Sequence, residues 1–304
     1  MLALDDLVKQ ASKNAKVTIA VAAAHDRDVM EAVISAGKEG IADAILIGDV
    51  NRICEIMDDM GENSNKYEII PASDNTACAR KAVQLVRTGK VNLLMKGILD
   101  TAELMRAVID KETGIRTGNL ISHTMVYESP SYHKLLFLTD GGMNTFPDLN
   151  AKKEILKNTA RLMRALGYEE IQAACVCGAE KVNPKITSTV DAQSLSDMTS
   201  EWAPYHMNVY GPVGLDLAIS PQACRHKGYS VKGGGKADIL LVPNYEVGNG
   251  IGKALSCFGN AKNAGIVLGA SAPIILVSRS DSAQSKLYSI ALGSVVTAAF
   301  HEHN

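Results

Sequence analysis

The sequence predicts an α/β protein built from two three-layer α/β/α domains with mostly parallel sheets. Its apolar segments have the length of strands and run without alternation, which is typical of strands buried on both faces of a parallel sheet. Amphipathic segments of helical length follow these runs, and that order favours right-handed crossovers. Of the 304 residues, 46% are hydrophobic but only 5% are aromatic. The core is therefore expected to be aliphatic, and the chain is long enough for two lobes.

The alternation of strand and helix is clear from the beginning of the chain. The run Val17–Ala23 has strand length, and Asp26 then stands at the head of an amphipathic helix. Further on, Asp74 or Asn75 is suited to cap a helix that Gly89 ends. The predicted strands are Val17–Ala23, Ala44–Ile47, Tyr67–Ile70 and Val91–Met95, with helices over Arg52–Met60 and from about Thr101.

A second lobe is predicted to begin near Gly118. Its helices include one that runs to Gly167 and one that follows Thr187-Ser188-Thr189. The remaining predicted strands are Ser122–Tyr127, Lys134–Leu138, Ile171–Cys177, Ile239–Val242 and Pro273–Val277, and Ser282–Phe300 is the last helix.

Charge and composition exclude some classes of function. The chain has 31 basic and 33 acidic residues, a net charge of −2, so it lacks the basic excess of a nucleic-acid binder. A small anionic ligand stays compatible with this balance, because a few local arginines suffice to bind one. The first residues include early acidic ones and no apolar run, and no segment suits a membrane span, so we expect a cytoplasmic protein. The six cysteines form no CxxC pair, which agrees with a reducing compartment.

The glycine-rich segment Gly248–Lys253 follows a predicted strand and is expected to open a helix. Lys253 stands where a dinucleotide fingerprint needs its third glycine, and Ala254 stands where a P-loop needs Ser or Thr. Two interpretations remain equally supported: a helix N-terminus that offers N–H groups to an anion, or a tight strand-to-helix turn. The histidine spacing indicates no metal site, and no GxSxG motif is present.

Polar groups follow three of the predicted strands, where ligands bind in open α/β sheets. Each of these strand ends offers hydroxyl, amide, carboxylate or cationic groups suited to an anionic ligand. The alternative for the last of them is that Ser280 or Asp281 merely caps the helix while Arg279 is solvated. We expect the three strand ends to line one cleft. They carry Lys96, Thr101 and Arg106; then Asp140 and Asn144; and finally Ser278, Arg279 and Asp281.

As a set, these segments make the chain resemble the phosphate acetyltransferase/phosphate butyryltransferase family, and within it the butyryltransferase branch. The resemblance covers nearly the whole chain, through MKGILDTAELMRAV, LTDGGMNTFPDLNAK, NPKITSTVDA, GPVGLDLAIS, KADILLVPNYEVGNGIGKAL and SRSDSAQSKLYSIAL. It implies a cytoplasmic, metal-free acyltransferase of short-chain fatty acid metabolism that moves an acyl group between coenzyme A and phosphate.

The resemblance also implies an isocitrate/isopropylmalate dehydrogenase-like fold with a cleft between the domains. In that fold the last strand and helix return to the first domain. The predicted domains are therefore residues 1–118 with 265–304, and residues 119–264.

Site residues follow from the resemblance only where the motif matches. Ser278 and Arg279 match a Ser-Arg pair that positions the thiol and the developing negative charge, and Arg106 matches an Arg that holds phosphate or acyl phosphate. In the acetyl enzymes the proposed base is an Asp seven residues after that Ser, but Ser285 stands there. The nearest carboxylate, Asp281, is our candidate for the base.

The other substrate-binding residues are less specific in their motifs. A second substrate-contacting arginine has no clear counterpart, and the region of Arg80 and Arg87 is where we expect it. The remaining predicted substrate-binding residues are Thr101, Lys96, Asp140, Asn144 and Asn249.

The predicted reaction is reversible, direct transfer of a short acyl group, expected to be butyryl, between coenzyme A and phosphate. Coenzyme A, phosphate and acyl phosphate are then substrates, no cofactor is bound permanently, and a homodimer or higher homo-oligomer is expected. Three alternatives stay open: a phosphate acetyltransferase, an acyl-CoA-sensing module without activity, and a metal-dependent hydroxyacid dehydrogenase of the same fold. The last is disfavoured, because neither an acidic metal cluster nor a dinucleotide loop is present.

Overall fold

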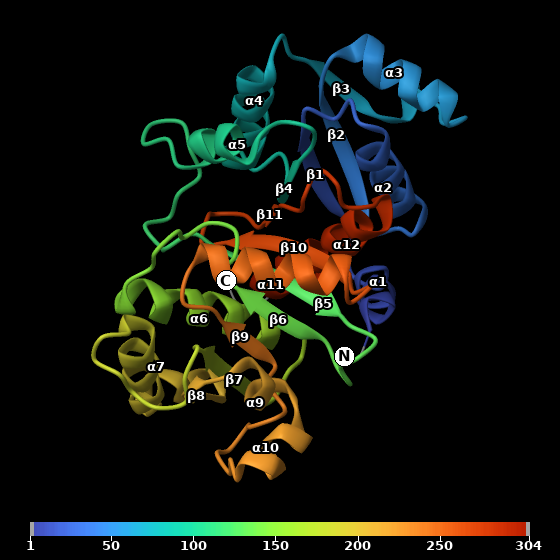
Figure 1. The fold of residues 1–304 in the computed structure, drawn as a ribbon. Helices are drawn as coiled ribbons and strands as arrows, with labels where there is room; N and C mark the ends of the chain where they lie inside the picture. Colours follow the sequence, from blue (N-terminus) through green and yellow to red (C-terminus); the bar gives the residue numbers. More distant parts are fainter. Residues whose placement is uncertain (1–2, 302–304) are drawn as a thin grey trace. The chain divides into compact units, whose positions relative to one another are not determined.

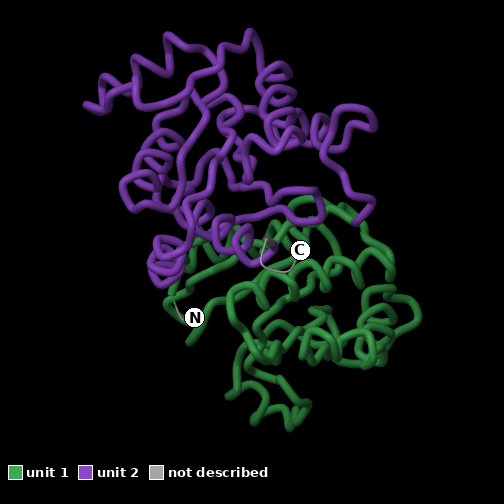
Figure 2. The backbone as a smooth tube through the Cα atoms, turned by 180° about the vertical axis from the view of Figure 1, so that it is seen from behind, with its two compact units in different colours: residues 1–3, 120–263 green, residues 4–119, 264–304 purple. Residues whose placement is uncertain are grey.

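The computed structural model describes residues 3–301, and these divide into two compact units (Figure 2). Unit 1 consists of residue 3 and residues 120–263, and unit 2 of residues 4–119 and 264–301. The predicted boundaries at 118/119 and 264/265 lie within one residue of this division. That these units are the two predicted domains stays a prediction.

Unit 2 holds a mostly parallel sheet with the strand order β3-β2-β1-β4-β11-β10 (Figure 1). Neighbouring strands are parallel except β10 and β11, which are antiparallel. The strands are β1 (Val17–Ala22), β2 (Ala42–Gly48), β3 (Glu68–Pro71), β4 (Leu93–Lys96), β10 (Lys262–Leu268) and β11 (Ile274–Ile275).

Helices cover both faces of this sheet. In Figure 1, α2 and α12 lie on one side of the strands, and α4 and α5 lie on the other. The helices are α1 (Leu4–Ala11), α2 (Arg27–Lys38), α3 (Val50–Asp59), α4 (Asn75–Arg87), α5 (Thr101–Val108) and α12 (Ala283–His301), with a short 3₁₀ turn, η1, at Ser64–Lys66.

The predicted cap and stop of α4 are confirmed. The Asp74 carboxylate accepts a hydrogen bond of 2.8 Å from the Ala77 N–H, and this satisfies one of the free donors of the first turn. Gly89, just beyond the helix, adopts a φ of +71°, a conformation that costs glycine little. Because these end signals are local, they are readable without knowledge of the tertiary structure.

In unit 1 the strands follow the order β5-β6-β9-β7-β8. Only β5 is antiparallel to its neighbour within this unit, so the predicted α/β class with mostly parallel sheets is confirmed. The strands are β5 (Ser122–Glu128), β6 (Leu136–Thr139), β7 (Ile171–Val176), β8 (Met207–Val213) and β9 (Ile239–Leu241). The helices are α6 (Leu149–Ala165), α7 (Thr187–Asp197), α8 (Thr199–Trp202), α9 (Leu215–Ile219), α10 (Pro221–Lys227) and α11 (Tyr245–Cys257), with a 3₁₀ turn, η2, at Ala203–Tyr205.

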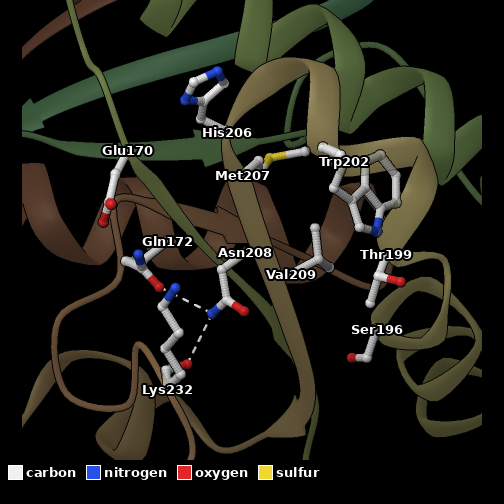
Figure 3. Close-up of a pocket in the computed structure, with 11 residues that line it drawn as sticks. Glu170, Gln172, Ser196, Thr199, Trp202, His206, Met207, Asn208, Val209 and Lys232 are labelled. Atoms are coloured by element: carbon white, nitrogen blue, oxygen red, sulfur yellow. Dashed lines mark hydrogen bonds between the residues drawn. The ribbon is translucent and has the colours of Figure 1, made fainter.

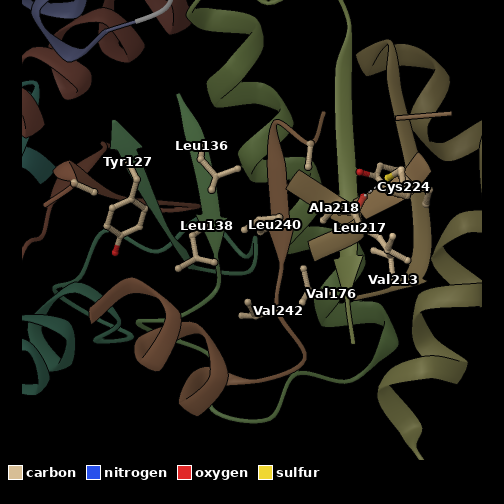
Figure 4. Close-up of a cluster of buried hydrophobic side chains, with 14 residues drawn as sticks. Tyr127, Leu136, Leu138, Val176, Val213, Leu217, Ala218, Cys224, Leu240 and Val242 are labelled. Carbon is tan, nitrogen blue, oxygen red and sulfur yellow. Dashed lines mark hydrogen bonds between the residues drawn. The ribbon is translucent and has the colours of Figure 1, made fainter. Parts of the chain in front are cut away.

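In the core of unit 1, successive side chains of β6 point to opposite faces of the sheet, and both faces are buried (Figure 4). Leu136 and Leu138 of β6 lie in the cluster that includes residues of α9 and α10, with Ile251 and Leu255 of α11 packed against it. Phe137, between them, is also fully buried but stacks edge-on against Tyr168, with ring centroids 5.6 Å apart. The unbroken apolar run therefore reflects two covered faces.

Three predicted elements differ from the structure. The strand predicted over Pro273–Val277 is only Ile274–Ile275, and α7 begins at Thr187 instead of after Thr189. The glycine-rich segment does not open a helix, because α11 begins earlier, at Tyr245. Asn244 caps that helix by accepting from the Val247 N–H at 3.0 Å, so the glycines lie inside it.

Among the helices of residues 3–301, none combines the length and the apolarity that a bilayer crossing requires. All six cysteines are free thiols.

Candidate active site

Two of the three predicted strand ends lie side by side in unit 2. Strands β4 and β11 are parallel neighbours, with Met95 opposite Ile275. The chain therefore leaves both strands at the same edge of the sheet, into the loops that carry Asp100 and Arg279. A guanidinium nitrogen of Arg279 donates to Oδ1 of Asp100 at 2.7 Å, which joins the two loops directly.

The loop after β4 is fixed against the loop after β1. The Gly97 and Ile98 N–H groups donate to the carbonyls of Ala22 and Ala23 at 2.8 and 3.0 Å. A Cβ at position 97 would overlap both carbonyl oxygens, so only glycine allows this approach. The loop then passes directly into α5, whose N-cap residue is Asp100.

The loop after β11 is a tight turn that presents Ser278. Oδ2 of Asp281 accepts from the Ser278 N–H at 2.8 Å, and the Asp281 N–H donates to the Ser278 carbonyl at 3.1 Å. The alternative that Ser280 or Asp281 caps the final helix is wrong. Oγ of Ser282 accepts from the Ser285 N–H at 3.3 Å at the start of α12, and Asp281 is occupied by the turn.

Lys96, at the last position of β4, is only 5% exposed. Its ammonium nitrogen donates to the carbonyls of Gly97 and Leu99 at 3.1 and 3.2 Å. Burial, together with the nearby positive charges of Arg279 and Lys286, lowers the pKa of Lys96 to about 8. This edge of the sheet is therefore electropositive and partly shielded from water.

A second buried lysine supports the loop after β11. Lys286, in the first turns of α12, is 3% exposed, and its ammonium group donates to the carbonyl of Asp281. Its nearest carboxylate is that of Asp28, with Nζ and Oδ2 3.9 Å apart. Each strand-end loop thus has a buried ammonium group hydrogen-bonded to its backbone.

Thr101 and Arg106 lie on α5, which Asp100 begins. Thr101 is half-buried and Arg106 is exposed, about 7.5 Å farther along the helix axis. That Arg106 and Arg279 converge on one substrate stays a prediction. Arg80 and Arg87, where a second substrate-contacting arginine was expected, are exposed on α4.

In unit 1, Asp140 follows β6 and is 1% exposed. Its carboxylate accepts from the N–H groups of His123, Gly142 and Met143 at 3.1, 2.8 and 2.8 Å, and from the side-chain amide of Asn144 at 2.7 Å. The Asn144 amide also donates to the Ile121 carbonyl at 2.9 Å. Both predicted binding residues are thus largely occupied in holding this loop.

The loop after β6 packs against α11 through two glycines. A Cβ on Gly248 would lie 2.6 Å from the Gly141 Cα, and a Cβ on Gly141 would lie 2.7 Å from the Gly248 carbonyl carbon. Asn249, predicted to bind substrate, is the exposed residue that follows this contact in α11.

A cavity of about 410 Å³ in unit 1 contains none of the predicted site residues (Figure 3). It lies where β7 and β8 begin, between Gln172 and Asn208 on one side and Trp202 on the other. The side-chain amide of Asn208 donates to Gln172 Oε1 and to the Lys232 carbonyl, both at 2.9 Å. Because the predicted residues follow the other ends of the strands, this cavity is separate from them.

Asp100 and Lys286 were not predicted as site residues, although both contact the predicted ones. Asp100 stands three residues before Glu103, a spacing typical of a helix N-cap, and Glu103 accepts from the Asp100 N–H at 3.2 Å. That spacing is a signal for the cap, but it carries no signal for the contact with Arg279. Lys286 had no signal of its own, because lysine in the first turns of a helix is usually solvated.

Comparison with known proteins finds similar sequences over nearly the whole chain. The family model described as "Phosphate acetyl/butaryl transferase" matches residues 3–80 and 73–294. The "Phosphate butyryltransferase" of Clostridium acetobutylicum is 44% identical over 290 residues, which cover 95% of this chain and 96% of that protein. The "Phosphate acetyltransferase" of Rhizobium meliloti is 37% identical over 294 residues, which cover 97% and 93%.

Solved structures share the fold. A branched-chain phosphotransacylase from Enterococcus faecalis V583 matches with a TM-score of 0.80 and 33% identity, over 92% of this chain and 99% of that one. A chain from Salmonella typhimurium described as a 4-hydroxythreonine-4-phosphate dehydrogenase matches with a TM-score of 0.53 and 13% identity, over 93% and 100%. The second likeness concerns the fold alone, and it agrees with the predicted dehydrogenase-like class. The chain belongs to the phosphate acetyltransferase/butyryltransferase family and is an acyltransferase.

Proposed function

We propose that this protein transfers a short acyl group reversibly between coenzyme A and inorganic phosphate, with butyryl as its preferred acyl group. The observation that carries the proposal is the meeting of Lys96, Lys286 and Arg279 at the adjacent ends of β4 and β11. Three cations share this edge, where Asp100 pairs with Arg279 and Asp28 lies 3.9 Å from Lys286. Clustered cationic donors of this kind suit a dianionic phosphate group. The identity of 44% to a protein named as a butyryltransferase, against 37% to one named as an acetyltransferase, supports butyryl.

Arg279 is proposed to bind the phosphate group and to stabilise the negative charge that develops on it. A guanidinium has five N–H donors in a planar fork, and its hydrogen bond to Asp100 uses one of them. The others are available to phosphate oxygens. Arg106 and Thr101 of α5 are proposed as further contacts to the phosphate or the acyl phosphate.

Ser278 is proposed to orient the sulfur and to donate to the oxyanion of the tetrahedral intermediate. One such donor is commonly worth about 3 kcal/mol of transition-state stabilisation. The hydrogen bonds between Asp281 and the backbone of Ser278 hold the turn that presents this hydroxyl. We therefore assign Asp281 a positioning role, which its substitution tests below.

The residues of unit 1 are proposed to act on coenzyme A through the loop after β6. Asp140 and Asn144 would shape that loop, because their polar atoms are engaged in it. Asn249, which is exposed, would contact the ligand directly. Coenzyme A is proposed as a substrate and not a resident cofactor. The protein is proposed to be cytoplasmic and to form a homodimer or higher homo-oligomer.

The test is thiol release from acetyl-, propionyl- and butyryl-CoA, each with and without phosphate. We expect phosphate-dependent release, fastest with butyryl-CoA, although one methylene is worth only about 1–3 kcal/mol. Binding of acyl-CoA without turnover would instead indicate a sensor. Arg279→Ala should raise the KM for phosphate and lower kcat, and unchanged kinetics would remove Arg279 from the mechanism.

A further inference from the structure

The buried amine of Lys96 has an unusual set of partners. Its two hydrogen bonds go to backbone carbonyls, those of Gly97 and Leu99, and within residues 3–301 it forms no ion pair with a carboxylate. A buried ammonium without a counter-ion is costly, since burial penalises the charged form. The neutral amine is therefore much closer in free energy to the charged one than it is on an exposed lysine.

The geometry around this nitrogen allows a proton to leave or arrive without disturbing the loop. A tetrahedral amine nitrogen has four positions, of which Cε takes one and the two N–H groups to Gly97 and Leu99 take two. The fourth position holds either a third proton or the lone pair. Both protonation states keep the same two hydrogen bonds, so Lys96 can exchange a proton while the loop after β4 stays in place.

Charged groups face Lys96 from four elements. The cations are Arg279, on the loop after β11, and Lys286, on α12, and both lower its pKa. The carboxylates of Asp100, at the start of α5, and Asp26, at the start of α2, raise it by less than burial and the cations lower it. The resulting pKa of about 8 is close to the value of about 8.5 for an alkyl thiol. Proton transfer between the two groups is then nearly balanced in free energy.

We infer that the amine of Lys96 carries the proton between the sulfur of coenzyme A and a phosphate oxygen during acyl transfer. This inference rests on the proposed function. When acyl phosphate and coenzyme A react, the S–H proton passes to the neutral amine as sulfur forms its bond to the carbonyl carbon. The bond from that carbon to the phosphate oxygen then breaks with its electron pair. The resulting phosphate takes the proton from the ammonium, so Lys96 returns to its neutral form.

In the reverse direction the neutral amine takes the proton of the attacking hydrogen phosphate as its oxygen bonds to the carbonyl carbon. The resulting ammonium then protonates the sulfur as the bond from carbon to sulfur breaks, so Lys96 again returns to its neutral form. Asp281 is less suited to this task, because its carboxylate is engaged by the Ser278 N–H. The Lys96 amine can take up a proton while it keeps both of its hydrogen bonds to carbonyls.

The first test uses the wild-type enzyme with acyl-CoA and phosphate, a direction in which no substrate thiol titrates. We expect kcat/KM to rise as the pH rises through about 8, because the free enzyme then gains the neutral amine that takes the proton of hydrogen phosphate. Lys96→Gln, which can still donate to the carbonyls, should lack this rise. A wild-type profile that stays level from about pH 7 to about pH 9.5 would overturn the inference.

The second test is chemical rescue. Lys96→Ala should lower kcat by about 10²- to 10⁴-fold, the usual contribution of a general acid or base. Methylamine should restore it at least tenfold, in proportion to the neutral amine. Lys96→Arg, which fills the space but cannot deprotonate, should be slow and not rescued, and methylamine should leave the wild-type rate unchanged. A Lys96→Arg enzyme with near wild-type kcat, or a folded Lys96→Ala enzyme that methylamine does not restore, would contradict the proton-transfer role. Failure of the wild type to release thiol with phosphate would instead refute the proposed function.

Discussion

The guanidinium of Arg279 and the carboxylate of Asp100 are 2.7 Å apart, although 179 residues separate them in the chain. The parallel pairing of β4 with β11 brings them together, because both residues follow the same edge of the sheet. Their side chains are 63% and 60% exposed, so the pair contributes little to stability, about 0.2–1 kcal/mol. Its significance is orientation: a helix N-cap holds an arginine that lies on a loop.

Replacing Asp100 with Asn should therefore affect phosphate binding more than folding. Asn is as good an N-cap as Asp, so α5 should keep its start. The guanidinium loses its charged partner, and we expect the KM for phosphate to rise about 1.4- to fivefold, the equivalent of about 0.2–1 kcal/mol of lost orientation. Steady-state kinetics with varied phosphate measure this change.

Asp74→Asn is the matched control, because Asp74 also caps a helix of unit 2 but contacts no arginine among residues 3–301. It should leave the KM for phosphate unchanged. If Asp100→Asn lowers that KM, Asp100 competes with phosphate for Arg279 and does not orient it.

Two substitutions of Asp281 test whether its carboxylate transfers a proton or holds the turn after β11. Asp281→Asn keeps an oxygen that accepts from the Ser278 N–H, so we expect it to retain at least about a third of wild-type kcat. Asp281→Ala removes the acceptor and should lose tenfold or more, through misplacement of Ser278. A loss of about 10²- to 10⁴-fold in both variants would instead support Asp281 as the general base.

Local signals predicted much of the fold. The β1 and β4 runs, the Asp74 cap and the Gly89 stop each depend on a few neighbouring residues. Strand β10 was missed because its segment, KNAGIVL, contains a buried Asn263 and a glycine that weaken the strand pattern. The start of α11 was misplaced because three glycines suggested a loop, whereas Asn244 supplies the cap and close packing at Gly248 accounts for one of them.

For the candidate site, the sequence predicted only which polar residues follow the ends of strands. The pattern of polar residues after apolar runs indicated Lys96, Arg279 and Asp140, since ligand groups gather there in α/β sheets. Which of these would be engaged by the backbone depends on tertiary contacts. The four hydrogen bonds to Asp140 and the carbonyl partner of Lys286 have no counterpart in sequence spacing.

Asp140 should be important for the stability of unit 1. Asp140→Ala leaves three backbone N–H groups and the Asn144 amide without their acceptor. At about 1–3 kcal/mol for each buried group that stays unsatisfied, we expect a loss of at least about 3 kcal/mol in the free energy of unfolding. Asp148→Ala, which removes one helix-cap hydrogen bond from the exposed start of α6, should cost only about 0.5–2 kcal/mol. Equal losses in urea unfolding would show that the Asp140 network does not act as described.

Two glycines of α11 should respond in opposite directions to alanine. A Cβ on Gly248 would lie 2.6 Å from the Gly141 Cα and 2.8 Å from Val242 Cγ2, so Gly248→Ala should destabilise the protein by about 1–3 kcal/mol. Among the described residues, nothing lies within 4 Å of a Cβ on Gly250, and Gly250→Ala should gain about 0.5–1 kcal/mol of helix stability. Thermal denaturation of both variants tests this prediction. If both are more stable than the wild type, the loop after β6 moves aside for the new Cβ at position 248 at little cost.

Lys96 should reduce stability at neutral pH, as expected for a buried charge kept for function. The pKa of Lys96 falls from 10.5 to about 8 on folding, so below about pH 8 the folded state bears the full cost of a buried ammonium. Between about pH 8 and 10.5 the unfolded chain binds more protons, and stability rises with pH until the cost disappears. Lys96→Met should therefore raise the free energy of unfolding at pH 7 by about 1–3 kcal/mol, since each pKa unit corresponds to about 1.4 kcal/mol and the Gly97 and Leu99 carbonyls lose their donor.

The advantage of Lys96→Met over the wild type should vanish near pH 10.5, where both states of the wild type are neutral. Lys152→Met is the matched control, because Lys152 is equally buried but pairs with Asp191 at 2.6 Å. Removing that lysine leaves a carboxylate without its partner and should cost about 3–5 kcal/mol at pH 7. Urea unfolding at the two pH values separates the cases: a Lys96→Met protein that is less stable than the wild type at pH 7 would mean that the two carbonyl hydrogen bonds outweigh the cost of burying the charge.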